Sequence, residues 1–217
     1  MTTTRPAFVD ELLSRPLPPL RPAKLSDTAN PPYSTALRAH IADARVHPAL
    51  EAALHLANDD LFSAHFLLRK QQAPPRAKWL HGILHAREGD VLNAKCWFRD
   101  TPTEVLALVY ASPVDASHAL DRLTLALGKD AARTRQDTED AEFVVDEAYS
   151  LADLEDLARQ DLEQDAREHL WRELNAIIDD LEREHGWVEM DGTEAYTEDP
   201  PELKEQNRVL GEGWRTF

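Results

Sequence analysis

The sequence predicts an all-α protein, an antiparallel helical bundle around a central helical hairpin. Three observations support this class. Apolar residues recur at spacings of three and four along several segments, as they do on one face of a helix. Only 7 of the 217 residues are glycine, which is few for a β-sandwich with its many turns. Proline, glycine and aspartate separate the apolar segments by short connections, which place successive helices antiparallel.

Residues 1–33 are expected to form a proline-rich N-terminal arm. Six prolines fall within residues 15–33, so this stretch cannot hold a regular helix and should be extended. The preceding segment, 8–15, predicts either two helical turns docked through Phe8, Leu12 and Leu13 or an unfolded arm.

A single all-α domain is predicted over residues 34–186. Pro48 suits the first turn of a helix, Asn58 or Asp59 can cap the next one, and Asp90 can cap another directly after Gly89. The helices expected in its first half span 34–46, 48–57, 59–71, 76–88 and 91–99.

The second half of this domain contains two further predicted helices. The first covers 115–127 and precedes an exposed loop at 129–140. Residues 142–149 have local β character without a partner strand. The longest helix, 150–185, carries one apolar stripe against an acidic back, which suits either a bundle helix or an intermolecular helix pair.

Residues 187–217 form an acidic tail interrupted by proline and glycine. Its aromatic residues favour an irregular strap over the domain, and its composition is equally compatible with disorder. In the first case the strap would be pinned by Trp187, Tyr196 and Trp214.

The charge is distributed unevenly. The net charge is −16; residues 1–100 hold 13 Lys/Arg and 10 Asp/Glu, while residues 101–217 hold 11 and 30. An acidic half repels phosphate backbones and anionic lipids, so nucleic acid and membrane are not expected as partners. A protein partner with a basic surface is the natural complement, and the alternative is a solvated face that keeps the protein soluble.

The chain gives no sign of export. It lacks an apolar run of membrane-spanning length, and its N-terminus has no apolar signal region. Its single cysteine, Cys96, cannot form an internal disulfide and is expected to be either a small buried thiol or a nucleophile activated by Lys95. A reducing, cytoplasmic location is therefore expected.

Residues 55–99 concentrate the chemistry-bearing side chains. They contain four of the nine histidines, two of the five tryptophans and the cysteine. His81 and His85 share a helix face at i, i+4, with Glu88 on the same side and His65 on the neighbouring helix. These four residues are candidate ligands for Zn²⁺ or Fe²⁺, with an open position for water.

Two other interpretations of the same residues remain open. His65 or His81 can act as an acid or base beside Asp59 or Asp60, which makes His65, His81 and Asp60 the candidate catalytic residues. The histidines can equally be interior residues that bond to the backbone or to carboxylates.

A candidate anion site follows from the residues around the Asp90 cap. Arg87, Asn93 and Lys95 can seat the carboxylate or phosphate of a cofactor near a helix N-terminus. The alternative is that these side chains form ion pairs with Glu88 and Asp90.

The hairpin carries two resemblances. Ala86, Ala94 and Phe98 around the Gly89-Asp90 turn make it similar to a single tetratricopeptide-type unit, without a 34-residue recurrence that would predict a solenoid. The region also resembles a group of fungal and bacterial helical proteins, although Leu80 separates a Trp and a His that are adjacent in that group. The matching residues are Asp59-Asp60-Leu61, His65, Trp79, His81, His85, Arg87-Glu88-Gly89-Asp90, Asn93-Ala94-Lys95 and Trp97-Phe98-Arg99.

The group resemblance implies a helical fold and a site in this region, and it implies no particular activity. The sequence therefore leaves two functions open. The first is a non-catalytic helical adaptor that binds a protein partner. The second is a small enzyme or metal-binding protein with a His/carboxylate site around His65, His81 and His85. The oligomeric state does not follow from either.

Overall fold

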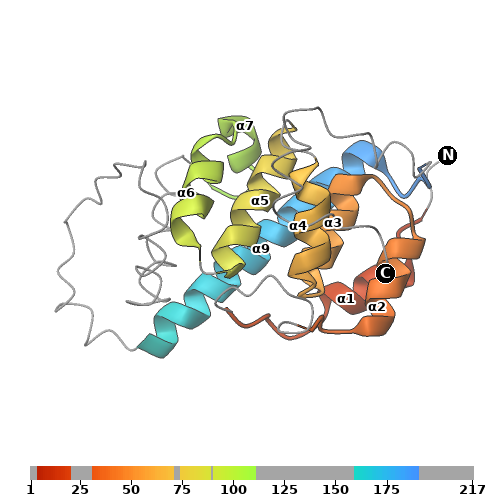
Figure 1. Cartoon of the computed structure of the whole chain (residues 1–217), viewed down its shortest axis with the longest axis horizontal. Coiled ribbons are helices and arrows are strands. Elements are labelled where there is room, and N and C mark those ends of the chain that lie inside the picture. The colour runs from red at the N-terminus through yellow and green to blue at the C-terminus, as the bar shows by residue number, and fades with distance from the viewer. Residues whose placement is uncertain (1–3, 21–30, 71–73, 89, 111–158, 191–217) are drawn as a thin grey trace.

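The computed structural model describes residues 4–20, 31–70, 74–88, 90–110 and 159–190, which contain eight helices and no strand. The all-α prediction is therefore confirmed for this part of the chain. Helices α3, α4, α5 and α6 lie side by side, and α9 crosses their row (Figure 1). The helices are α1 (Ala7–Leu13), α2 (Thr35–Asp43), α3 (Pro48–Ala57), α4 (Leu61–Arg69), α5 (Pro75–Glu88), α6 (Val91–Arg99), α7 (Thr103–Leu106) and α9 (Arg159–His185).

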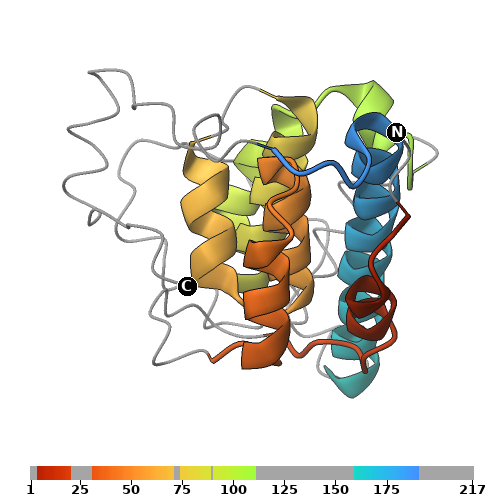
Figure 2. The same cartoon turned by 90° about the vertical axis from the view of Figure 1, so that its right-hand side faces the viewer.

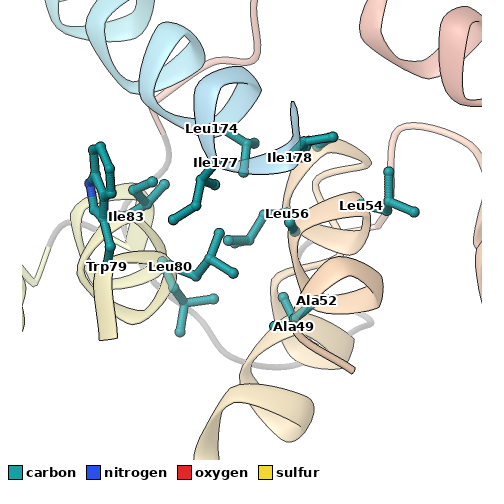
Figure 3. Packing of buried hydrophobic residues seen from close by; sticks show 14 of the residues in the cluster. Ala49, Ala52, Leu54, Leu56, Trp79, Leu80, Ile83, Leu174, Ile177 and Ile178 are labelled. Carbon is teal, nitrogen blue, oxygen red and sulfur yellow. The ribbon is translucent and has the colours of Figure 1, made fainter. Parts of the chain in front are cut away.

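The helices form layers around α3 and α5. Helix α9 packs against α3 and α5, while α4 lies on the other side of α3 (Figure 2). The apolar stripe of α9 meets buried side chains of α3 and α5 and so forms the core between these helices (Figure 3). The buried residues that lie there include Leu56, Leu80, Ile83, Leu174, Ile177 and Ile178.

Helices α3–α4 and α5–α6 form two consecutive hairpins, which we call the first and the second hairpin, and their turns repeat the same backbone geometry. Asp60 caps α4 with φ −85° and ψ 68°, and Asp90 caps α6 with φ −84° and ψ 71°. The amide of Asp60 donates to the carbonyl of His55, and that of Asp90 to the carbonyl of His85, each at 2.9 Å.

The sequences of the two hairpins correspond at an offset of thirty residues. His55 matches His85, Asp60 matches Asp90, and Glu51 matches His81. The sequence analysis predicts one such hairpin, whereas the structure contains two with the same turn. Further matched pairs are Leu50/Leu80, Leu54/Leu84, Ala64/Ala94, Leu68/Phe98 and Arg69/Arg99.

Gly82 shows how the second hairpin accommodates a larger side chain than the first. A Cβ atom at this position would lie 2.7 Å from the ring of Phe98, which is closer than packed atoms approach. The corresponding pair in the first hairpin is Ala52 and the smaller Leu68. Glycine at 82 therefore allows α5 to approach the phenylalanine of α6.

The N-terminal segment folds back onto the bundle. Helix α1 forms, as one of the two predicted alternatives has it, and buries Val9 and Leu12, with Phe8 and Leu13 partly buried. Arg15 then reaches the turn of the first hairpin. Its guanidinium donates to the carbonyl of Ala57 at 2.8 Å and to Asp59 Oδ2 at 2.7 Å.

Several predicted boundaries shift. Helix α4 begins at Leu61 rather than 59, because Asp60 is its cap. The short helix α7 was not predicted.

Trp187 is buried and donates to Glu182 Oε1 at 2.8 Å. The predicted features at 115–127, 129–140, 142–149, 150–158 and 191–217, with Gly89, lie outside the described residues.

Among the described helices, none is both long enough and apolar enough to cross a membrane.

Candidate functional site

Helix α5 is buried from Trp79 to its end, which forces the polar residues there to find partners inside the protein. Trp79 and every residue after it, to Glu88, are buried. One face of α5 packs against α9, where the Trp79 indole donates to Glu173 Oε2 at 3.2 Å. The polar side chains on the other faces of α5 meet α4, α6 and the turn of the first hairpin.

Three histidines converge between α4 and α5 and form a buried group that could bind a metal. One ring nitrogen from each of His65, His81 and His85 lies within 4.8 Å of the others. The rings of His81 and His85 are stacked at 5.1 Å, one helical turn apart. His65 approaches both rings edge-on at 5.2 Å. We call these three residues the trihistidine group.

Trp97 of α6 closes one side of the trihistidine group. Its ring is stacked on that of His81 with centroids 4.0 Å apart and planes 10° apart. His81 Nδ1 is buried and has no hydrogen-bond partner among the described residues. This nitrogen is therefore available to a ligand without the loss of a hydrogen bond within the protein. Sequence analysis names Trp97 only among the residues of the group resemblance, and its place over His81 depends on how α6 returns along α5.

Glu88 connects two members of the trihistidine group. One carboxylate oxygen lies 3.0 Å from His85 Nδ1 and the other lies 3.6 Å from His65 Nδ1. The sequence analysis places Glu88 among the metal ligands, whereas here its carboxylate faces the two imidazoles. A carboxylate on Nδ1 orients a metal-binding histidine and leaves Nε2 for the ion.

The environment keeps His81 neutral. Burial lowers its pKa to about 2, and the nearby His85, His65 and Arg69 act in the same direction. Burial also lowers the pKa of His65, although the contact with Glu88 opposes this change. Neutral imidazole is the form that binds metal ions, so His81 and His65 need not lose a proton to become ligands at neutral pH.

Glu88 stays ionised in the same surroundings. Burial by itself would raise its pKa, but the contacts with His65 and His85 outweigh burial and leave the pKa lowered. The site therefore combines imidazole nitrogens with one buried carboxylate charge.

Asn93 and Asp90 lie at the edge of the trihistidine group. The Asn93 side-chain nitrogen is 3.2 Å from His85 Nε2 and 3.3 Å from Asp90 Oδ2. Asp90 Oδ2 is 3.9 Å from His85 Nδ1. An ion on His85 Nε2 would replace the contact with Asn93 and leave this amide beside the ion.

The structure places Asp60, a candidate catalytic residue, in another network. Its carboxylate binds the guanidinium of Arg38 at 2.8 Å and lies 3.1 Å from His55 Nδ1. It also accepts from the amide of Ser63 as the cap of α4. Asp60 therefore does not lie beside His65 and His81 as predicted. The side chain that converges with these two histidines is His85.

The candidate anion-site residues also separate. Arg87 is buried and binds Asp59, which Arg15 contacts as well. Asp59 has a φ of 58°, in the left-handed region that aspartate tolerates better than most residues. Asn93 lies beside His85, while Lys95 and Cys96 are half-buried on α6.

The geometry fits a small transition-metal ion. Zinc–nitrogen bonds of about 2.0–2.1 Å bring tetrahedral ligands to roughly 3.4 Å of one another, so the ring nitrogens need shift by an ångström or so. Imidazole suits Zn²⁺, Cu²⁺, Fe²⁺ and Ni²⁺. Three protein ligands leave a fourth position open, as in catalytic zinc sites.

No family model matches this chain, and no curated protein or solved structure is significantly similar to it.

Proposed function

We propose that this protein binds one divalent transition-metal ion through His65, His81 and His85, with a fourth position open to water or a small ligand. The convergence of three ring nitrogens within 4.8 Å carries the proposal. The unpartnered His81 Nδ1 and the carboxylate of Glu88 against two of the rings support it.

The open position points to metal-dependent chemistry more than to a purely structural ion. A structural zinc site has four protein ligands, whereas a catalytic site has three and a water. A bound ion lowers the pKa of that water to about 7 and so supplies hydroxide at neutral pH. The side chain of His65 is 14% exposed, which gives the site a side that meets solvent.

The first experiment measures metal in the purified, untagged protein by inductively coupled plasma mass spectrometry. We expect near-stoichiometric Zn or Fe in the wild type and its loss in His65→Gln/His85→Gln. The matched control is His47→Gln/His185→Gln, which removes a second pair of stacked rings, 3.6 Å apart, outside the trihistidine group. The control should retain the ion.

Calorimetric titration of the chelator-treated protein with Zn²⁺ measures zinc affinity directly. The result then does not depend on which metal ions the expression host supplies. Circular dichroism confirms that each variant is folded. Glu88→Gln should weaken zinc binding by about 10–100-fold, because the orienting carboxylate is lost while the three nitrogens remain. A folded wild-type protein that takes up neither Zn²⁺ nor Fe²⁺ would refute the proposal.

The protein-partner function stays a prediction. Large apolar side chains that are exposed in the described residues are Tyr33, Phe62, Leu108 and Val188. They lie in four separate segments of the chain, and single exposed apolar residues are ordinary on a protein surface.

A further inference from the structure

We infer that Trp97 is a positioning residue of the metal site, because its indole holds the ring of His81 in a stacked orientation that metal binding has to break. This inference rests on the proposed function, since it concerns how the trihistidine group rearranges when the ion enters. It gives the indole a role in setting the metal affinity, in addition to packing.

Two rings of the trihistidine group are not oriented to share one ion. A metal ion binds an imidazole along the lone pair of a ring nitrogen, which lies in the plane of the ring. An ion shared by two histidines therefore lies close to both ring planes. The rings of His81 and His85 are stacked with their planes 7° apart, so these planes do not meet near the rings. One of the two rings has to turn before both can bind the same ion.

The ring that is free to turn is that of His81. The ring of His85 has a polar partner at each nitrogen atom, with Glu88 at 3.0 Å from Nδ1 and Asn93 at 3.2 Å from Nε2. In contrast, His81 Nδ1 is buried without a hydrogen-bond partner among the described residues. Rotation of a histidine ring about its Cβ–Cγ bond is intrinsically soft. The neighbours of the His81 ring therefore decide its orientation.

Trp97 is the neighbour that opposes the turn. Its ring lies flat against that of His81, with centroids 4.0 Å apart and planes 10° apart. At this distance the indole covers one face of the imidazole, so the ring of His85 lies against the other face. A stacked aromatic pair contributes stability beyond the area that it buries. Turning His81 toward the ion gives up this stack, so the indole favours the metal-free orientation.

The first hairpin shows that the fold accepts an aliphatic side chain in place of the indole. At the offset of thirty residues, Trp97 corresponds to Leu67, which is buried in the core. His81 corresponds to Glu51, which has no ring to stack on. The indole and the imidazole therefore occur together in the hairpin that contributes to the trihistidine group, and leucine is the natural replacement for a test.

The test measures the zinc affinity of the chelator-treated, full-length protein by calorimetric titration. Trp97→Leu should lower the Kd for Zn²⁺ about 2–10-fold, because stacking no longer opposes the turn of His81. Trp97→Phe, which keeps a smaller ring, should lower the Kd by a smaller factor. Trp171→Leu is the matched control and should leave the Kd unchanged, because Trp171 is also half-buried but lies on α9. A residue that only supported the packing of the site would weaken zinc binding when it is replaced.

Proton NMR reports the turn of the ring itself. The face of an indole shields protons that are stacked on it, and this shielding ends when the stack is broken. The ring protons of His81 should therefore move further downfield on zinc binding in the wild type than in Trp97→Leu. Comparing the two proteins removes the direct effect of the ion on these protons.

The outcomes separate this inference from the proposed function. A zinc Kd in Trp97→Leu that equals or exceeds that of the wild type overturns the inference alone, and so do equal shifts of the His81 ring protons in the two proteins. If circular dichroism shows that Trp97→Leu does not fold, an unchanged or raised Kd in Trp97→Phe overturns the inference instead. Failure of the folded wild type to bind Zn²⁺ overturns both proposals.

Discussion

The two hairpins share one capping geometry and one histidine–aspartate pair at matching positions, yet different side chains surround the histidine in each. In the first hairpin, His55 lies between Glu51 and Asp60, and Asp60 also binds Arg38. In the second, the position of Glu51 is taken by His81. His85 therefore has an imidazole one turn before it instead of a carboxylate.

This exchange changes the charge of the buried group. Burial by itself would lower the pKa of His55, but its contacts with Asp60 and Glu51 leave the pKa raised. In contrast, the pKa of His81 is lowered to about 2. In the first turn Asp60 faces both His55 and Arg38, whereas in the second the neutral ring of His81 is stacked on that of His85. The same cap geometry thus occurs with a stabilising ion network in the first hairpin and with the proposed metal ligands in the second.

The largest effect that distinguishes the turns should come from their capping aspartates. Asp60→Ala leaves buried His55 and half-buried Arg38 without their carboxylate and should cost about 3–5 kcal/mol of unfolding free energy. Asp90→Ala should cost about 1 kcal/mol, the value of a helix cap, because the Asp90 side chain is 33% exposed and Glu88 still faces His85. Urea denaturation at pH 7 measures both. Equal losses would show that the two turns do not differ as described.

Buried carboxyl groups on opposite faces of α5 extend the comparison. Glu88 faces two imidazoles, whereas Glu173 has the Trp79 indole as its hydrogen-bond donor, and burial raises the pKa of Glu173 to about 8. The folded protein therefore keeps this proton up to about pH 8, while the unfolded chain releases it near pH 4.5. Stability is lost as the pH rises between these values.

Glu173→Gln should remove the loss of stability that the wild type shows as the pH rises toward 8. At pH 8 the variant should be more stable than the wild type by about 4 kcal/mol, and the difference should shrink toward pH 5. Urea denaturation across this range measures the difference. A variant less stable than the wild type at pH 8 would show that the Glu173 carboxylate is stabilised by a cation.

The sequence predicts the helices well where the signals are local. Pro48, Asp60 and Asp90 mark helix starts because the first-turn and capping positions have strict backbone requirements, and α3 and α6 have their predicted bounds. The i, i+4 spacing of His81 and His85 likewise places them on one face. Local spacing does not report on neighbouring helices, which is why Asp60 is predicted beside His65 but lies with Arg38 and His55.

The repeat was missed for a related reason. The two hairpins match in a few residues at an offset of thirty, and their common feature is the backbone geometry of the caps Asp60 and Asp90. Several residue types can occupy a cap, so a shared cap geometry leaves only a faint trace in the sequence. The sequence signal of the repeat is the pair of His-x₄-Asp segments, His55 to Asp60 and His85 to Asp90.

The smallest expected effect concerns the histidines themselves, and it has opposite signs in the two turns. The unfolded chain protonates its histidines below about pH 6.5, but folded His81 stays neutral down to about pH 2, so the wild type loses stability as the pH falls below 6.5. His55 keeps its proton above pH 6.5 in the folded state, so its stabilisation is present below 6.5 and is lost as the pH rises.

His81→Leu should therefore flatten the acid side of the stability profile, by up to about 1.4 kcal/mol per pH unit, and should leave the chelator-treated protein about 1 kcal/mol more stable at pH 7. His55→Leu should destabilise the protein most at acid pH, because it leaves Asp60 and Glu51 buried without their imidazolium. Urea denaturation in chelator from pH 5 to 8 compares them. If both variants lose stability with the same pH dependence, His81 is a structural residue of the same kind as His55. If they diverge as expected, the second turn carries a histidine that the fold does not need, and the protein keeps it for the ion.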